Sequence, residues 1–265
     1  MGDQNTVPRR INNVEGAAGQ FIVNSGPGVV ERFGDLHDNL ATRGKLFFIP
    51  TLGVNGVTGW TKVENAVTVN NEDERYLTLT VPDQLAAADG RAYLPTWGLI
   101  PNAGVSGRIR WAQELFWQFI IERRVAEATS PPLCYVQLKQ GSLAGGLVAQ
   151  GIGIRIGDDG ANPHSADRKL YGESYGSGGS DEVVDLGTTL AHATEYTIGI
   201  HHKPGNWVMW YVNGALAGTQ SDTDHVPIGF AGATTFYVVS ADKAGTDPDA
   251  VTYFRVGKFL VWQGY

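Results

Sequence analysis

Hydrophobic and polar residues alternate most clearly in the stretch between residues 195 and 219. Tyr196, Ile198 and Ile200 recur at every second position, and polar or small residues lie between them. Side chains of a β-strand point alternately to its two faces, so a period of two predicts a half-buried strand. We therefore expect a strand from residue 195 to about residue 202, with one apolar face.

Two turn signals divide the rest of this stretch. Residues 203–206 read Lys-Pro-Gly-Asn, in which proline presets φ and glycine accepts a positive φ. Asn213-Gly214 is typical of a type I′ hairpin turn, because both residues tolerate positive φ. Residues 207–212, rich in aromatic and β-branched side chains, predict the strand between the two turns. Three consecutive antiparallel strands are therefore expected, with no room for a helix.

The same period recurs along most of the chain. It predicts further strands over residues 45–51, 60–69, 76–81, 115–126, 134–138, 151–156, 183–186, 236–240 and 253–262. Residues 109–125 also fit one face of a helix, but their Trp, Phe and Ile side chains favour a strand. Residues 82–92 are expected to form a connection, and residues 158–181, which are polar and rich in Gly and Ser, a long loop. Short strands separated by turns predict an all-β sandwich or barrel.

Composition excludes several classes of protein. The chain has 265 residues and 42% hydrophobic residues, which is enough for a proper core, and its 35 glycines show no three-residue period. A net charge of -7 without a basic block argues against nucleic acid and anionic membranes as partners. No apolar run reaches the roughly 20 residues of a membrane span, so membrane insertion is not expected. Cys134 is the only cysteine, and we expect it to be a small buried residue.

Residues 1–45 lack the regular alternation of the remainder and begin with a polar segment. They predict an N-terminal arm, which leaves residues 46–265 as the main domain. Two interpretations of the arm remain open: it packs along the main domain, or it docks onto a neighbouring subunit. The first residues are polar and lack the hydrophobic core of a signal peptide. The localisation is therefore left open. The chain is expected to be either a mature form with an added Met or a protein released by another route, such as lysis with a virus particle.

Several stretches resemble the concanavalin A-like lectin/glucanase superfamily, including its LamG-like members. They are residues 151–160, 195–200 and 207–214 and the closing run 256–262, so the resemblance covers roughly residues 46 to 265. It implies an antiparallel two-sheet β-sandwich (jelly roll), here with a short N-terminal arm. It does not define an activity, because the superfamily includes lectins, glucanases, alginate lyases, adhesion modules and viral surface proteins.

The catalytic motifs of these relatives are not matched. Glucanases of the superfamily carry Glu-x-Asp-x-x-Glu on one strand, which places the carboxylates on one face. Here the acids at 72–74 fall in a predicted turn, and Glu114 and Glu122 stand alone on their strands. Alginate lyases of similar fold use Arg, Gln, His and Tyr on inner strands. Their counterparts in this sequence would be Gln118, Arg123, Gln137, His201 and Tyr211, but the strand motifs differ.

Aromatic side chains are the candidates for binding a sugar, because their rings stack on the apolar faces of pyranoses. We single out Trp60, Trp97, Tyr171, Tyr175 and Trp207. Oxygen-rich loops suit a hard cation such as calcium. No other cofactor is expected. The calcium candidates are Asp158, Asp159 and Asn162.

These observations predict a non-catalytic recognition or structural protein that is lectin-like. Its expected partners are a glycan or the protein subunits of an assembly, including copies of itself in a homo-oligomer. One setting that fits is a virion surface, as a capsid decoration or a tail or fibre component. The alternative is a polysaccharide hydrolase or lyase with a diverged active site.

Overall fold

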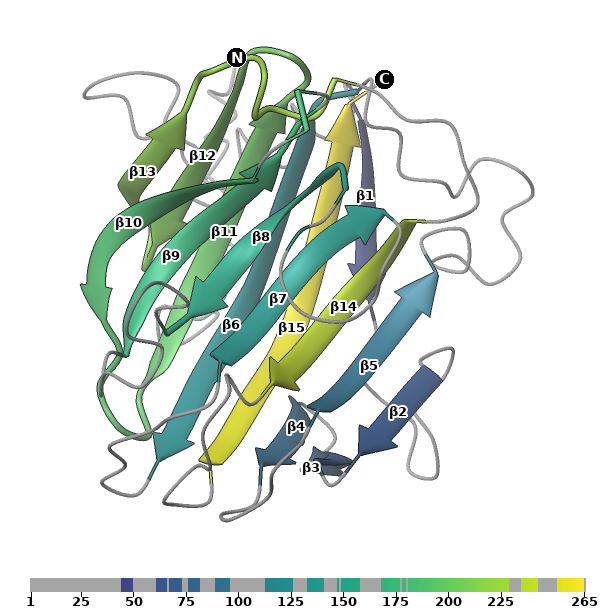
Figure 1. The fold of residues 1–265 in the computed structure, drawn as a ribbon, viewed down its shortest axis with the longest axis vertical. Helices are drawn as coiled ribbons and strands as arrows, with labels where there is room; N and C mark the ends of the chain where they lie inside the picture. The colour runs from purple at the N-terminus through teal and green to yellow at the C-terminus, as the bar shows by residue number, and fades with distance from the viewer. Residues whose placement is uncertain are drawn as a thin grey trace, which may run out of the picture.

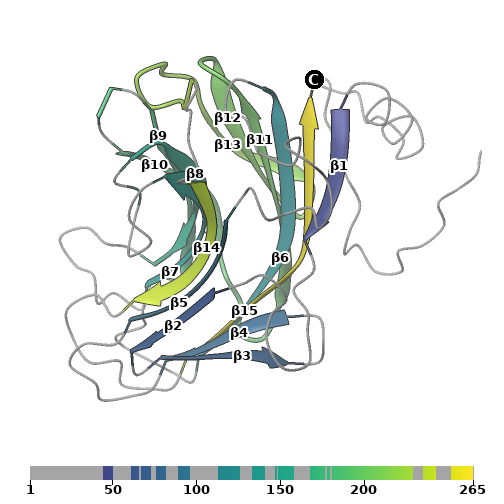
Figure 2. The ribbon, with the colours of Figure 1, turned by 90° about the vertical axis from the view of Figure 1, so that its right-hand side faces the viewer.

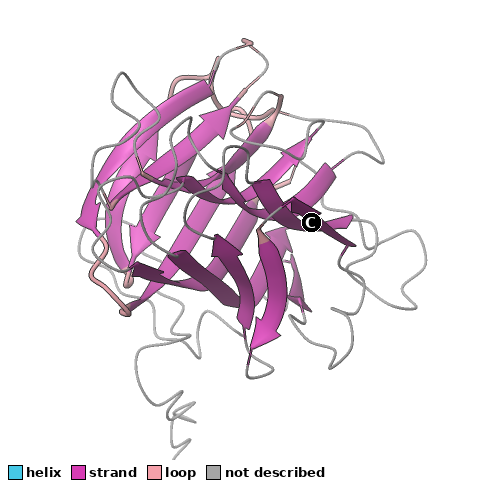
Figure 3. Cartoon of the chain, turned by 60° about the horizontal axis from the view of Figure 1, so that its bottom comes forward, coloured by secondary structure: helices cyan, strands magenta, loops and turns pink. Residues whose placement is uncertain are grey.

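The computed structural model describes residues 44–49, 61–65, 67–72, 76–81, 89–95, 113–125, 133–140, 147, 149–157, 168–176, 178–179, 181–228, 235–242 and 252–264. These residues form strands, turns and loops without a helix (Figure 3), so none of them forms a helix that could cross a membrane. The strands are β1 (Gly44–Ile49), β2 (Thr61–Asn65), β3 (Thr68–Glu72), β4 (Tyr76–Val81), β5 (Asp89–Pro95), β6 (Leu115–Val125), β7 (Leu133–Gln140), β8 (Gly151–Ile156), β9 (Lys169–Tyr175), β10 (Asp181–Thr189), β11 (Glu195–Lys203), β12 (Trp207–Val212), β13 (Ala215–Gln220), β14 (Thr235–Asp242) and β15 (Thr252–Gly264).

The strands form two antiparallel sheets that pack face to face (Figures 1 and 2). The eight-stranded sheet has the order β13-β12-β11-β6-β15-β4-β3, and β1 pairs with β15 beside this path. The seven-stranded sheet has the order β10-β9-β8-β7-β14-β5-β2. Strands distant in sequence are therefore neighbours, since β15 lies between β6 and β4, and the predicted antiparallel two-sheet sandwich is confirmed.

The core lies between the sheets and follows the two-residue period of the strands. On β6 the odd-numbered residues, such as Trp117 and Phe119, are fully buried in it. They meet the even-numbered residues of β7 and β8, which include Val136 and Ile154. Cys134 is buried in the same core, as expected, and burial raises the pKa of its thiol to about 11. The thiol is therefore protonated and inaccessible, so it is not a nucleophile.

The turn predictions around β11 to β13 are confirmed in their backbone angles. Gly205 lies between β11 and β12 with a φ of 61°. Asn213 and Gly214 lie between β12 and β13 with φ of 49° and 83°, as a type I′ turn requires. The long strand expected over residues 115–126 is likewise observed, as β6.

Three other predictions were wrong. Residues 60–69 were expected to form one strand, but they contribute β2 to one sheet and the start of β3 to the other. The expected connection at 82–92 contains most of β5, whose Gly and charged residues have low strand propensity. The expected loop at 158–181 contains β9, in which Gly172 and Ser174 take core-facing positions usually held by large apolar residues.

Trp210 of β12 ties the two sheets together and explains the glycine on β9. Its indole lies directly against Gly172, where an added Cβ would come within 2.5 Å of the ring. Its Nε1 donates a hydrogen bond of 2.9 Å to the backbone oxygen of Gly153 on β8. This large core side chain therefore makes its hydrogen bond across the sandwich and links β12 of one sheet to β8 and β9 of the other.

Candidate functional site

The candidate site is the face of the seven-stranded sheet that is turned away from the eight-stranded sheet. The sheet is curved and this face is its inner curve (Figure 2), and we call it the hollow face. Because Cys134, Val136 and Leu138 point into the core, the residues between them on β7 point to the hollow face. The same alternation assigns one face to each residue of β8, β9 and β10.

The register of the strands sorts these hollow-face residues into three rows across the sheet. The first row runs from β14 to β10 through Ser240, Tyr135, Arg155, Tyr171 and Asp185. The second contains Val238, Gln137, Gly153, Glu173 and Val183. The third contains Lys139, Gly151, Tyr175 and Asp181. A sheet face this rich in polar groups is not a second hydrophobic core. Its charged, amide and hydroxyl side chains are groups that can bind a ligand.

Gly153 allows the polar groups of β7 and β9 to meet above β8. Gln137 Nε2 donates a hydrogen bond of 2.6 Å to Glu173 Oε2, although a whole strand separates the two residues. Lys139 Nζ donates to Gln137 Oε1 at 3.1 Å. A Cβ at Gly153 would lie 2.8 Å from Gln137 Cγ and 2.5 Å from the backbone oxygen of Val136. The hydrogen-bonded chain therefore depends on the missing side chain.

Arg155 links this buried chain to the tyrosines of β9. Its Nη1 lies 3.6 Å from Glu173 Oε1, and both side chains are almost completely buried. Its Nε donates to the backbone oxygen of Gly157 at 3.2 Å, and its guanidinium lies over the Tyr171 ring at 5.2 Å from the centroid. A cation over an aromatic face is attractive, so Arg155 holds Tyr171 in place.

Exposure changes along the hollow face. The polar residues of β7 and β8 are buried, whereas Tyr171 and Tyr175 are half-buried and Asp181 and Asp185 are exposed. Among the hollow-face residues whose exposure is described, the accessible ones therefore lie on β9 and β10. There the two tyrosines share one face four residues apart, with Glu173 between them, which separates their Cα atoms by about 13 Å.

The structure separates the residues that the sequence grouped together. Tyr171 and Tyr175 lie together on the hollow face, in a strand and not in the predicted loop. Trp207 lies on β12, on the face of the eight-stranded sheet turned away from the core. Trp60 and Trp97 lie outside the described residues, as do Asp158, Asp159 and Asn162. The described residues hold no group of His, Cys, Asp and Glu that could bind a metal, and calcium stays a prediction.

The residues compared with alginate lyases do not converge. Gln118, His201 and Tyr211 lie on the outer face of the eight-stranded sheet, because their strand neighbours point into the core. Arg123 is on the opposite, core-facing side of β6 and is 1% exposed. Gln137 alone lies on the hollow face. A lyase site built from these five residues is therefore not present in this arrangement.

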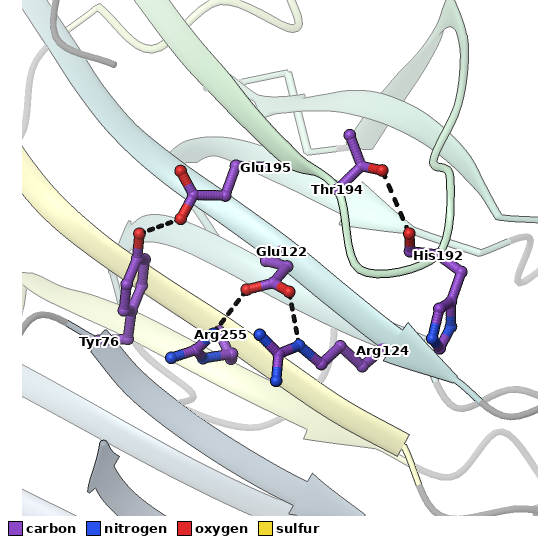
Figure 4. A network of polar contacts seen from close by, with 7 residues as sticks. All are labelled: Tyr76, Glu122, Arg124, His192, Thr194, Glu195 and Arg255. Atoms are coloured by element: carbon purple, nitrogen blue, oxygen red, sulfur yellow. Dashed lines mark hydrogen bonds and ion pairs between the residues drawn. The ribbon is translucent and has the colours of Figure 1, made fainter. Parts of the chain in front are cut away.

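Glu122 is not isolated, although it is the only acid on β6. It lies opposite Glu195 of β11 on the outer face of the eight-stranded sheet, in the network of Figure 4. Glu122 accepts hydrogen bonds from Arg255 Nη1 at 2.7 Å and from Arg124 Nε at 2.5 Å. The Tyr76 hydroxyl donates to Glu195 Oε1, and the Arg255 guanidinium lies 4.5 Å from the Tyr76 ring centroid.

The charges of this network explain its pKa values. Burial of Glu122 would raise the pKa of its carboxyl, but the hydrogen bonds from Arg124 and Arg255 outweigh burial and lower it. Burial, followed by the hydrogen bond to Glu195, raises the pKa of Tyr76 to about 12. A carboxylate held by two guanidinium groups in this way is a structural ion cluster.

The sequence missed the residues that make the hollow face distinctive, namely Tyr135, Lys139, Arg155 and Glu173. A usable signal was present, because residues 135, 137 and 139 are polar between the apolar residues of β7. Such alternation indicates that a strand has a polar face. It does not indicate which polar faces of different strands lie side by side, and that depends on the strand order.

Neither a protein-family model nor a curated protein sequence matches this chain. Solved structures do match it. The carbohydrate recognition domain of Emp47p is 11% identical with a TM-score of 0.53, and the match covers 85% of this chain and 99% of that one. A prokaryotic β-1,3-1,4-glucanase (lichenase) derived from a mouse hindgut metagenome is 12% identical with a TM-score of 0.51, and the match covers 84% of this chain and 100% of that one.

A sialidase matches at 10% identity with a TM-score of 0.50, over 83% of this chain but only 18% of the sialidase. At these identities the likeness shows the fold alone. The chain therefore has the concanavalin A-like jelly-roll fold that its sequence resembles. This fold is shared by carbohydrate recognition domains and glucanases, so the site has to decide the function.

Proposed function

We propose that this protein binds a glycan on the hollow face, over β9 and β10. The observation that carries the proposal is the pair of half-buried tyrosines, Tyr171 and Tyr175, on one face of β9. A tyrosine offers an apolar ring that stacks on a sugar and a hydroxyl that bonds to the sugar's hydroxyl groups. Two tyrosines about 13 Å apart along a rigid strand offer two contacts to a chain of sugars.

The buried polar residues behind the tyrosines support this role. Arg155 lies over the Tyr171 ring, and Glu173 and Gln137 hold Arg155 through the chain of contacts described above. A ring that is fixed before the ligand arrives loses less entropy on binding. The fold is also compatible with the role, because similar structures include a carbohydrate recognition domain and a lichenase.

Calorimetric titration with soluble β-glucan, xylan, mannan and pectin tests the proposal. We expect at least one polysaccharide to bind, and Tyr171→Ala and Tyr175→Ala each to weaken binding about tenfold, as for other aromatic contacts. The matched control is Tyr253→Ala, because Tyr253 is a 41% exposed tyrosine on the other sheet. No binding across a broad glycan array, or equal losses in all three variants, would overturn the proposal.

A second candidate function, cleavage of a polysaccharide, has one specific observation in its favour. Glu173 is a buried carboxylate on the hollow face, beside the tyrosines and in contact with Gln137 and Arg155. Two other carboxylates on this face, Asp181 and Asp185, are exposed on β10. Reducing-sugar and unsaturated-uronate assays separate the two functions, since turnover that disappears in Glu173→Gln would establish an enzyme.

The virion setting stays a prediction. None of the similar structures named above is a virion protein, and no described contact bears on a partner subunit or on a homo-oligomer. Electron microscopy of assembled particles remains its direct test.

A further inference from the structure

A second cluster of aromatic and polar side chains lies on the outer face of the eight-stranded sheet. His201 Nε2 and Glu114 Oε1 are 2.6 Å apart in a hydrogen bond between the start of β6 and β11. The His201 ring packs edge to face against Trp207, with centroids 4.7 Å apart and an interplanar angle of 85°. On its other side it meets Phe116 at 5.9 Å, also edge to face.

This cluster is accessible. The Glu114 side chain is 43% exposed, the His201 side chain is 14% exposed, and Trp207 is half-buried. Phe116 is buried beneath them and serves as packing. The cluster therefore presents an indole beside an imidazole and a carboxylate that are already oriented by their own hydrogen bond.

We propose that Trp207, His201 and Glu114 form a second glycan-binding site, which takes a neutral sugar ring. The indole offers a stacking surface, and the carboxylate and imidazole beside it offer an acceptor and a switchable donor or acceptor for neighbouring hydroxyls. The hydrogen bond from His201 lowers the pKa of the Glu114 carboxyl, so this acceptor is charged at neutral pH. A carboxylate at the rim also repels an anionic sugar, which is why the ligand class is neutral.

The position of this site gives it a consequence. Trp207 and the tyrosines of β9 lie on opposite faces of the sandwich, since each faces away from the core on its own sheet. A single copy of the chain with both sites would bridge two glycan chains. This bridging rests on the proposed hollow-face function, whereas sugar binding at Trp207 does not.

Indole-specific nitrogen-15 NMR tests the Trp207 site directly. The Trp207 signal is identified by its loss in Trp207→Phe, and wild-type protein is titrated with neutral oligosaccharides of glucose, xylose and mannose. We expect this signal to shift with one of them, and Glu114→Gln, which keeps the size of the side chain, to weaken that shift about tenfold. An unmoved Trp207 signal, or undiminished binding by Glu114→Gln, would overturn the site.

The double variant Tyr171→Ala with Tyr175→Ala separates this inference from the hollow-face proposal. If both sites exist, the double variant keeps the Trp207 shift but no longer precipitates a soluble polysaccharide, and Trp207→Ala loses precipitation while retaining hollow-face binding. A double variant that retains all binding contradicts the hollow face alone. Tyr253→Ala, on the same outer face as Trp207, is the control that changes neither readout.

Discussion

At the scale of single residues, His202 shows how burial sets a charge state. It lies on the core face of β11 and is 0% exposed, and its Nε2 is 2.9 Å from the backbone oxygen of Pro227. Burial lowers the pKa of His202 to about 4, and the hydrogen bond to Pro227 opposes this only in part. In the unfolded chain an imidazole titrates at about pH 6.5.

The protein is therefore expected to lose stability between about pH 6.5 and pH 4, because there the unfolded chain binds a proton that the folded chain does not. The part of the free energy of unfolding that depends on a neutral His202 is fully present above pH 6.5. It amounts to about 3 kcal/mol at most. Urea unfolding of wild type and His202→Gln at pH 7 and pH 5 measures it, since the variant lacks this dependence. Exposed His192→Gln is the control, and equal pH slopes in wild type and His202→Gln would contradict the prediction.

Residue types alone identified part of the candidate site. Tyr171 and Tyr175 were singled out because they are aromatic, and they lie on one face of β9 with Glu173 between them. Trp207 was singled out for the same reason and lies on the opposite side of the molecule. A ring's chemistry can be read from the sequence, but its neighbours depend on strand order. For the same reason Arg155 and Glu173, which support Tyr171, gave no signal of their own.

At the scale of elements, β6 shows what binds the middle of the eight-stranded sheet together. The strand pairs with β11 on one side and β15 on the other. Its Glu122 meets Arg255 across the β15 pairing, and both side chains are less than 8% exposed (Figure 4). A buried ion pair is destabilised strongly when one partner is removed, because the other charge loses its compensation.

Glu122→Gln is therefore expected to lower the free energy of unfolding by about 2–4 kcal/mol. Glu195→Gln should cost less than about 1 kcal/mol, because the exposed Glu195 can be replaced by an amide that still accepts the Tyr76 hydroxyl. Equilibrium unfolding in urea measures both values. Similar losses in the two variants would mean that the buried pair adds nothing beyond the exposed hydrogen bond.

Strand β6 itself was predicted from residue types, whereas β2, β3, β5 and β9 were not delimited correctly. In β6 the Trp, Phe and Ile residues decide between helix and strand. In β9 only Leu170 is a large core residue, and the next two core positions are Gly172 and Ser174, because Trp210 fills the space in front of Gly172. The apolar bulk that large residues of a strand normally supply thus comes from a side chain of the other sheet. The sequence of β9 alone therefore does not show the hydrophobic alternation of a strand.

At the scale of the whole molecule, the two sheets are joined by the interlocking of large side chains from one sheet with gaps in the other. The sandwich fold was predicted because alternation and turns are repeated along the whole chain. The interlocking was not, because it depends on which strands face each other across the core. Trp210 is the clearest example of this interlocking. Its indole occupies the gap at Gly172 and donates a hydrogen bond to the backbone oxygen of Gly153.

Gly172→Ala is accordingly expected to destabilise the protein by about 1–3 kcal/mol, the range for overpacking a filled core. The added Cβ would lie 2.5 Å from two ring atoms of Trp210, so the indole must shift and strain its hydrogen bond to Gly153. Gly199→Ala is the matched control, because it also lies in mid-strand but its Cβ would stay at least 3.2 Å from its neighbours. Thermal unfolding followed by tryptophan fluorescence compares them, and a midpoint for Gly172→Ala no lower than that for Gly199→Ala would show that the sheets tolerate a wider spacing at Trp210.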